Sequence, residues 1–128
     1  MRLLLDTHLL LWAAQKSTRL SAIASKLIAD PGNELIFSVA SLWEFAIKYA
    51  KAPAGFNVSP TELREALMQN GYSELEIGAK HVLAIAGLPA LHSDPFDRIL
   101  IAQSAVEGIT LITSDERVAQ YPGSVRKV

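Results

Sequence analysis

Leu3-Leu4-Leu5-Asp6-Thr7-His8 is the stretch that decides the fold, because a short apolar run ends there at an acid. Consecutive leucines without alternation are typical of a strand buried on both faces of a parallel sheet. Two later apolar runs, residues 35–39 and 109–113, have the same character. Each is followed by a stretch with helical patterning, so we expect strands that alternate with helices along the chain.

Turn residues and capping residues bound the remaining elements. Pro60 stands early in one predicted helix and Gly108 stops another. Right-handed crossovers between parallel strands place helices on both faces of a sheet. The sequence therefore predicts an α/β fold, a three-layer α/β/α sandwich around a central, mainly parallel sheet of about five strands. Helices are predicted over residues 9–14, 22–29, 40–51, 59–70, 79–86, 94–107 and 115–119, and the other two strands over residues 74–77 and 125–128.

Composition limits the class of protein. With 128 residues, 50% of them apolar, the chain is expected to fold as a single domain over residues 1–128. It contains no Cys, which excludes a disulfide framework, a thiolate zinc site and a cysteine nucleophile. The net charge of −1 gives no general attraction for nucleic acid, so any such contact must be local. Asp6 and His8 interrupt the apolar run that resembles a signal peptide, and no other stretch approaches the roughly 20 apolar residues of a membrane span. We expect a cytoplasmic protein without a membrane segment.

Four acids from distant segments are expected at one edge of the sheet. Asp6 and Asp115 follow strands, Glu44 lies about one turn into a helix after a strand, and Asp97 lies in the first turn of another helix. Ligands of open parallel sheets bind at the carboxyl ends of the strands. Gathered carboxylates repel one another, by about 4 kcal/mol for two charges roughly 4 Å apart at an effective dielectric of 20. Their hard oxygen atoms suit Mg²⁺ or Mn²⁺, ions that support phosphodiester hydrolysis.

Each acid also has a structural interpretation. Asp94 and Asp97 have the positions of an N-cap and a first-turn acid that favours the helix dipole. Glu44 precedes Lys48 by four residues, the spacing of an ion pair on a solvated helix face. Asp6 caps nothing obvious. The functional interpretation therefore depends on the combination of acids.

Taken together, the motifs resemble the PIN domain, in particular the single-domain VapC-type toxins of bacterial and archaeal toxin-antitoxin pairs. The motifs that carry this resemblance span nearly the whole chain in order: Leu3-Leu-Leu-Asp6-Thr7-His8, Ser38-Val-Ala-Ser-Leu-Trp-Glu44, His92-Ser-Asp94-Pro-Phe-Asp97-Arg98-Ile-Leu-Ile-Ala-Gln103, and Leu111-Ile-Thr-Ser-Asp115-Glu116.

The resemblance implies a metal-dependent endoribonuclease. In it, one or two Mg²⁺ or Mn²⁺ ions and a metal-activated water hydrolyse the RNA phosphodiester, and no histidine base is required. The catalytic and metal-binding residues it implies are Asp6, Glu44, Asp97 and Asp115. Candidates that would orient carboxylates or contact substrate are Thr7, Ser38, Ser114, Asp94, Arg98 and Lys48. Arg117, Lys16 and Arg19 are further candidates for flanking phosphates.

Histidines and aromatic residues have less specific roles. His81 lies in an apolar helix and is expected in the core or at the surface, whereas His92 is expected to shape the rim of the site. The aromatic side chains Trp12, Trp43, Phe45 and Phe96 are expected in the core or in a dimer interface rather than against RNA bases. Arg98 has an alternative role as an ion-pair partner of Asp94.

The resemblance also implies partners: an RNA substrate, a small antitoxin whose tail occupies the active-site groove, and a second copy of the chain in a homodimer. Two alternatives stay open, a non-catalytic PIN-like binding module and a solitary RNA-processing nuclease. An aspartate-nucleophile phosphatase is disfavoured, because its Asp-x-Asp motif would need a second acid where His8 stands.

Overall fold

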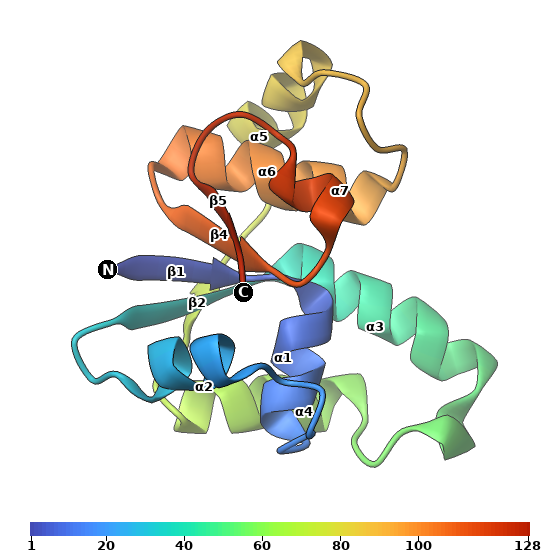
Figure 1. Ribbon diagram of the computed structural model, residues 1–128. Coiled ribbons are helices and arrows are strands. Elements are labelled where there is room, and N and C mark those ends of the chain that lie inside the picture. The colour runs from blue at the N-terminus through green and yellow to red at the C-terminus, as the bar shows by residue number, and fades with distance from the viewer.

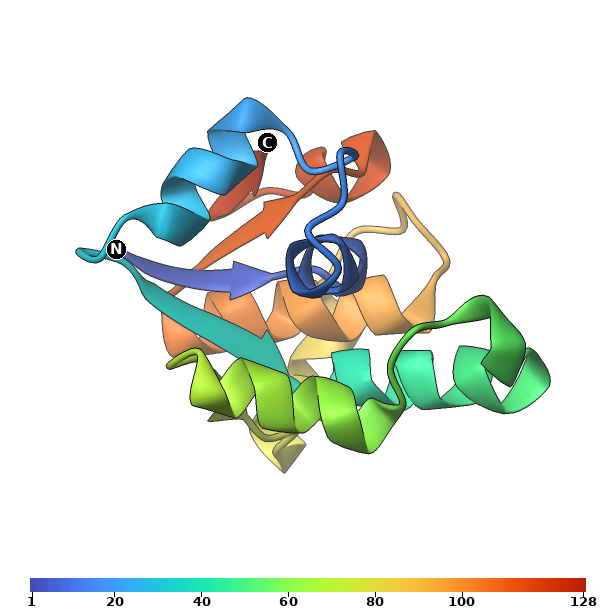
Figure 2. The same ribbon diagram turned by 90° about the horizontal axis from the view of Figure 1, so that it is seen from below.

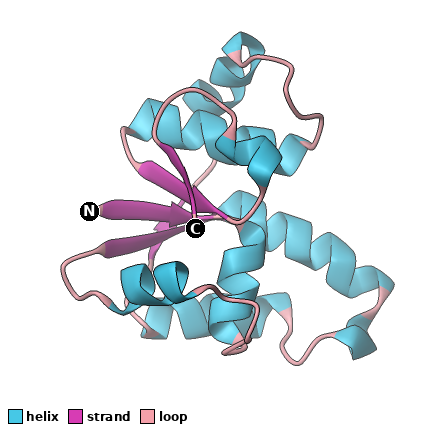
Figure 3. Ribbon diagram, viewed as in Figure 1, coloured by secondary structure: helices cyan, strands magenta, loops and turns pink.

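A computed structural model describes residues 1–128 as a five-stranded parallel sheet surrounded by helices (Figures 1 and 3). The strands lie in the order β3-β2-β1-β4-β5, and every neighbouring pair is parallel. Their bounds are β1 (Arg2–Leu5), β2 (Glu34–Ser38), β3 (Ser73–Leu75), β4 (Thr110–Thr113) and β5 (Val125–Lys127). This arrangement confirms the predicted α/β sandwich, with a sheet that is parallel throughout.

Helices connect the strands. They are α1 (Thr7–Ala14), α2 (Ala22–Ala29), α3 (Val39–Lys51), α4 (Pro60–Gln69), α5 (Ala79–Ala84), α6 (Pro95–Glu107) and α7 (Glu116–Ala119), with 3₁₀ turns η1 (Pro53–Gly55) and η2 (Ile85–Gly87). Figure 2 shows α1 at the tip of β1, viewed almost along the helix axis. The structure contains no helix long and apolar enough to cross a membrane.

Two apolar clusters fill the spaces on the two faces of the sheet. Leu3 and Leu5 of β1 point into one cluster, which α1, α2, α3 and α4 complete. Leu4 points to the other, which contains residues of α3, α6, β4 and α7. Because successive side chains of a strand point to opposite faces, the leucine run of β1 supplies both clusters and lies at the centre of the sheet.

Capping residues fix where the helices begin and end. Ser59 and Glu62 form a reciprocal capping box at the start of α4, with bonds of 3.2 and 3.0 Å, and Pro60 occupies the first turn. Gly108 ends α6 in the left-handed region at φ 67°, where a side chain would be strained. These signals were readable in the sequence, which is why these two helices have the predicted bounds to within a residue.

Several predicted boundaries differ from the structure. The edge strand β3 lies at Ser73–Leu75 instead of residues 74–77, and α1 begins at Thr7 instead of residue 9. Helix α5 ends at Ala84, and the chain tightens there into η2 before Leu88. Short elements such as β3 and α5 carry too few periodic residues to fix their ends.

The aromatic side chain of Trp43, expected in the core or in a dimer interface, lies outside the core of the chain. Trp43 is 58% exposed, on the outer side of α3, and meets Phe96 edge to face with ring centroids 4.9 Å apart. Phe45, two residues later on α3, is completely buried. The apolar pattern of α3 therefore continues onto its solvent side.

The chain order of the strands reverses at the centre of the sheet. From β1 the chain proceeds outward through β2 and β3, then returns to β4 on the other side of β1 and continues to β5. The carboxyl ends of β1 and β4 thus form the switch point at which open parallel sheets bind ligands. Figure 1 shows α1, α3 and α7 starting at this edge.

Candidate active site

Asp6 is a buried acid at the carboxyl end of β1. Its side chain accepts hydrogen bonds at both oxygens, from the Leu9 amide (2.9 Å) and from the Thr113 hydroxyl (2.5 Å). The Leu9 bond makes Asp6 the N-cap of α1, so the interpretation that Asp6 caps nothing is wrong. Burial raises the pKa of Asp6, and the hydrogen bond from Thr113 opposes that rise. A buried carboxylate held in this way gains from a nearby cation.

Thr113 is a site residue that the sequence patterns did not reveal. It is fully buried at the end of β4, where it donates to Asp6 and accepts from the Asp115 amide at 3.0 Å. One hydroxyl therefore connects two of the predicted acids. The signal was the register of β1 and β4, which pairs Leu5 with Ile112 and so brings the following residues of the two strands side by side.

Asp115 caps α7. Its Oδ1 accepts from the amides of Arg117 (2.7 Å) and Val118 (3.3 Å), which leaves Oδ2 without a protein donor. Ser114, predicted to orient a carboxylate, contributes its backbone rather than its hydroxyl, since its amide lies near Asp6 and lowers the pKa of that acid. Asp115 thus serves as a cap and still offers one oxygen to a ligand.

Glu44 lies on α3, one turn beyond Ser41, and is only 8% exposed. Its predicted ion pair with Lys48 is present at 3.1 Å. The expected solvated helix face is wrong for Glu44, because its side chain is buried, as is that of Ser41 one turn earlier. Ser41 accepts a hydrogen bond of 3.0 Å from the Thr7 hydroxyl, which ties α3 to α1.

The hydroxyls of Thr7 and Ser38 do not contact the acids, contrary to expectation. Thr7 donates to Ser41, as described above. Ser38 caps α3 and donates to the buried Gln103 side chain of α6 at 2.6 Å. Gln103 in turn donates to the Glu76 carbonyl at 3.2 Å. These hydroxyls therefore fix the helices that carry the acids instead of binding the acids themselves.

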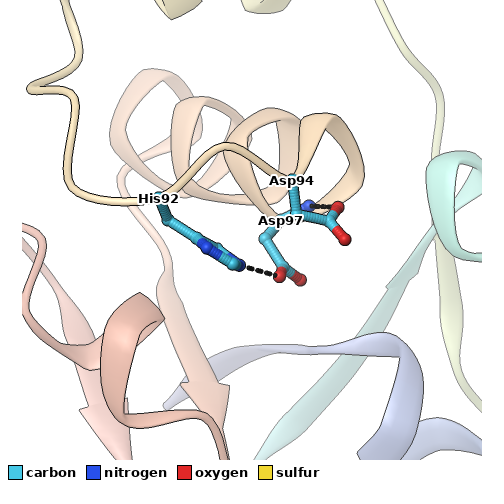
Figure 4. Close-up of side chains that lie close together, drawn as sticks. All are labelled: His92, Asp94 and Asp97. Atoms are coloured by element: carbon cyan, nitrogen blue, oxygen red, sulfur yellow. Dashed lines mark hydrogen bonds and ion pairs between the residues drawn. The ribbon is translucent and has the colours of Figure 1, made fainter.

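Asp97 and its neighbours form a tight cluster at the start of α6. Asp94 caps the helix by accepting from the amides of Phe96 (2.8 Å) and Asp97 (3.1 Å). The His92 ring bonds the Asp97 carboxylate through Nε2 at 2.7 Å, as Figure 4 shows. One ligand atom from each of His92, Asp94 and Asp97 lies within 4.8 Å of the other two.

The ionisation of Asp97, like that of Asp6, is disturbed by its surroundings. Burial is the main cause that raises its pKa to about 6, and the charges of Asp94 and Glu44 raise it further, whereas His92 opposes them. The contribution of Glu44 indicates that the acids of α3 and α6 are near enough to repel one another. A carboxylate with a raised pKa beside other acids is typical of a functional site.

Arg98 does not pair with Asp94, so that alternative is wrong. Its guanidinium instead contacts the carbonyls of Ile85, Pro89 and His92 and the Tyr121 hydroxyl, at 3.0 to 3.3 Å. Four neutral oxygen atoms, from the segment before α6 and from Tyr121, therefore hold Arg98 in place of an ion pair with Asp94. Of the two places expected for His81, the core or the surface, the structure shows the core, since His81 is 2% exposed and bonded to Glu107 at 2.7 Å.

The donor set fits a hard divalent cation. Of the four predicted acids, only Glu44 has the charged side-chain nitrogen of a Lys or Arg within 4.0 Å. Asp6 and Asp97 are mostly buried, and burial raises the pKa of both. Carboxylate oxygens in excess over protein cations are suited to Mg²⁺ or Mn²⁺, while the nitrogen of His92 would be tolerated better by Mn²⁺.

Comparison with known proteins agrees with this geometry. Residues 3–124 match the model of the PIN domain, and no curated protein sequence matches the chain. Similar folds occur in solved structures of VapBC2 from Rickettsia felis bound to a promoter DNA fragment (TM-score 0.72, 16% identity, 99% of this chain and 98% of that chain) and of DNA-bound VapBC from Salmonella typhimurium (TM-score 0.68, 11% identity, 99% and 98%). A toxin-antitoxin complex from Klebsiella pneumoniae is similar over 96% of this chain and 94% of that chain, with a TM-score of 0.64 and 18% identity. Because the family model covers almost the entire chain, including the buried acids at the edge of the sheet, the protein belongs to the PIN domain family.

Proposed function

We propose that the protein is a metal-dependent endoribonuclease of the VapC type, the toxin of a toxin-antitoxin pair. The observation that carries the proposal is the buried Asp6 at the switch point of the sheet, which the Thr113 hydroxyl connects to Asp115, with no Lys or Arg side chain paired to either acid. Glu44 on α3 lies near enough to Asp97 on α6 to raise the pKa of that acid. Membership of the PIN domain family and the fold shared with VapBC complexes support it.

In this proposal Asp6, Glu44, Asp97 and Asp115 hold one or two Mg²⁺ or Mn²⁺ ions. A divalent ion bound there would neutralise the acids and the substrate phosphate and lower the pKa of water for hydrolysis. Asp115 offers its unbonded Oδ2, and Asp6 is oriented by Thr113. The ammonium group of Lys48 partly offsets the negative charge of Glu44. A ring nitrogen of His92 holds the Asp97 carboxylate in position.

The site test is metal-dependent cleavage of RNA. Purified protein would be incubated with a labelled RNA hairpin and with mixed transfer RNA, in Mn²⁺, in Mg²⁺ and in chelator. We expect cleavage that requires metal and is lost in Asp6→Asn and Asp97→Asn. Glu65→Gln is the matched control, because Glu65 is an exposed acid on α4 outside the cluster. Folded, metal-loaded protein that cleaves no RNA would instead support the non-catalytic binding module.

The partners are part of the same proposal. The solved structures with similar folds include toxin-antitoxin complexes, which supports a small antitoxin as the partner of this chain. A short reading frame beside the gene is the first place to look for it, and co-expression should yield a complex in which RNA cleavage is suppressed. If active protein has no such neighbour, it is a solitary RNA-processing nuclease. Light scattering of the free protein tests the proposed homodimer.

A further inference from the structure

We infer that a cationic cavity beside the acids binds a phosphate of the RNA next to the scissile one. This inference rests on the proposed nuclease function, whose site it extends. The cavity has a volume of about 510 Å³ and lies between the loop before α6, the first turn of α6, and α7. Its lining residues are Ala90, Leu91, His92, Ser93, Arg98 and Arg117.

The cavity has a net positive lining. It contains two arginines and no acid, and neither arginine has a carboxylate oxygen within 4.0 Å. All four groups that contact the Arg98 guanidinium are neutral, three carbonyls and the Tyr121 hydroxyl. These contacts satisfy N–H groups but leave the positive charge without a counter-ion. The cavity therefore attracts an anion.

Arg98 is already held in position. Tyr121, the second residue after α7, is 3% exposed. Its hydroxyl accepts a hydrogen bond from Arg98 of α6 and donates one of 3.2 Å to the His92 carbonyl in the loop before α6. The Nε–H of Arg98 has no protein partner, and Nη2 has only one. A guanidinium carries five N–H donors, so two remain for a phosphate, and a held side chain loses little entropy on binding.

The position of the cavity favours RNA over other anions. His92 lines the cavity and its ring bonds the Asp97 carboxylate, so one residue contacts both the cavity and the acid cluster. Arg98 follows Asp97 directly, and Arg117 lies two residues after Asp115. A phosphodiester chain carries one charge per nucleotide. A strand whose scissile phosphate lies at the acids therefore brings its next phosphate close to these arginines.

Arg117 is the residue with which to test the inference. It is exposed and its side chain makes no hydrogen bond or ion pair within the protein, so a substitution should leave the fold intact, unlike a change at Arg98. We would measure the dissociation constant of a short labelled single-stranded RNA by fluorescence anisotropy, in chelator to prevent cleavage and over a series of salt concentrations. The variants are Arg117→Gln and Arg117→Lys. The control is Arg2→Gln, which removes the same charge at the amino end of β1.

We expect Arg117→Gln to weaken binding about fivefold and to reduce the salt slope by roughly 0.7, the value for one phosphate contact of a single strand. Arg117→Lys should restore both, and Arg2→Gln should change neither. One methylphosphonate linkage, which removes the charge of a single phosphate, would be placed at each position of the RNA in turn. At one position it should weaken RNA binding by the wild type and leave RNA binding by Arg117→Gln unchanged. That pattern identifies a phosphate rather than a base.

Other outcomes overturn the inference or the proposed function separately. An Arg117→Gln variant with unchanged affinity and salt slope, in protein that cleaves RNA, overturns the phosphate site and leaves the nuclease in place. Arg117-dependent binding by a wild type that never cleaves RNA supports the cavity and contradicts the nuclease. If Arg117→Gln weakens only an acidic peptide and not RNA, the cavity serves a protein partner and the inference is wrong.

Discussion

At the scale of single residues, the orientation of the Asp6 carboxylate depends on a hydrogen bond from the Thr113 hydroxyl. Thr113→Val keeps the shape of the side chain but removes the donor to Asp6 and the acceptor for the Asp115 amide. An unsatisfied buried polar group costs about 1–3 kcal/mol, so we expect the melting temperature to fall by roughly 4–11 °C. Loss of such a supporting contact also weakens metal affinity, by about 10-fold or more.

Calorimetry with and without Mn²⁺ checks both effects of Thr113→Val. Thr110→Val is the control from the same strand, because the Thr110 hydroxyl contacts only the exposed Ser124 hydroxyl at 2.7 Å. Equal stability and equal metal affinity for the two variants would contradict the role given to Thr113.

Asp97 makes stability depend on pH in a defined direction. Its pKa is about 6 in the folded protein and 3.8 as the reference value, so the folded state holds the proton more tightly between these values. In metal-free protein the protonated carboxyl of Asp97 therefore contributes fully to the free energy of unfolding below pH 3.8. This contribution is lost as the pH rises through about 6. Asp97→Asn removes the charge and keeps an acceptor for His92. We expect it to raise the melting temperature in chelator above pH 6 and to have little effect near pH 4.

A series of melting curves from acidic to neutral pH checks this expectation. The exposed acid Glu65, as Glu65→Gln, should give a difference from the wild type that does not change over that range. If the difference between Asp97→Asn and the wild type is also independent of pH, the buried charge at residue 97 does not cause a pH dependence of stability.

At the scale of secondary-structure elements, the acids of the site are also helix caps. Three helices begin at such acids: α1 at Asp6, α6 at Asp94 and α7 at Asp115. Each acid caps a helix and can also contribute to a metal site. Substitutions can separate the two roles at Asp115. Asp115→Asn keeps the cap and removes the charge, so stability should stay within about 0.5 kcal/mol while metal-dependent cleavage is lost. Asp115→Ala should lose cleavage and also about 1 kcal/mol of stability.

Chemical denaturation of both Asp115 variants, together with the RNA cleavage assay, measures the separation. If Asp115→Asn cleaves RNA as the wild type does, the carboxylate is only a cap, which is the structural interpretation that the sequence left open.

The elements show why the sequence predicted some features and not others. The order of strands and helices was predictable because apolar runs and capping residues such as Ser59 and Gly108 are local signals. The placement of the acids followed from the same order, since parallel strands have their carboxyl ends at one edge. The contacts of Thr113 and Arg98 were not predictable. They join residues up to 107 positions apart in the chain, and no local pattern contains that information.

At the scale of the whole molecule, the net charge of −1 conceals an uneven distribution. Acids gather at the carboxyl edge of the sheet, and Arg98 and Arg117 stand beside them without acidic partners. Under the proposed nuclease function, a bound divalent ion and the two arginines would together meet consecutive phosphates of RNA, although the chain has no general basic field. Composition alone could exclude a basic surface but could not locate this pair of charges.

With the proposed metal site at these acids, the stability of the whole molecule should depend on metal. An ion that binds only the folded state stabilises it by mass action, by about 2.7 kcal/mol at a concentration 100 times its dissociation constant. For a chain of this length that corresponds to a rise of roughly 10 °C in melting temperature. We expect Mn²⁺ to produce such a rise in the wild type and in Glu65→Gln, and chelator to reverse it. Asp6→Asn and Asp97→Asn should show a much smaller rise, because each removes one charge from the donor set. An equal rise in all four proteins would place the bound ion elsewhere on the molecule, and the acids at the sheet edge would then be helix caps without a metal.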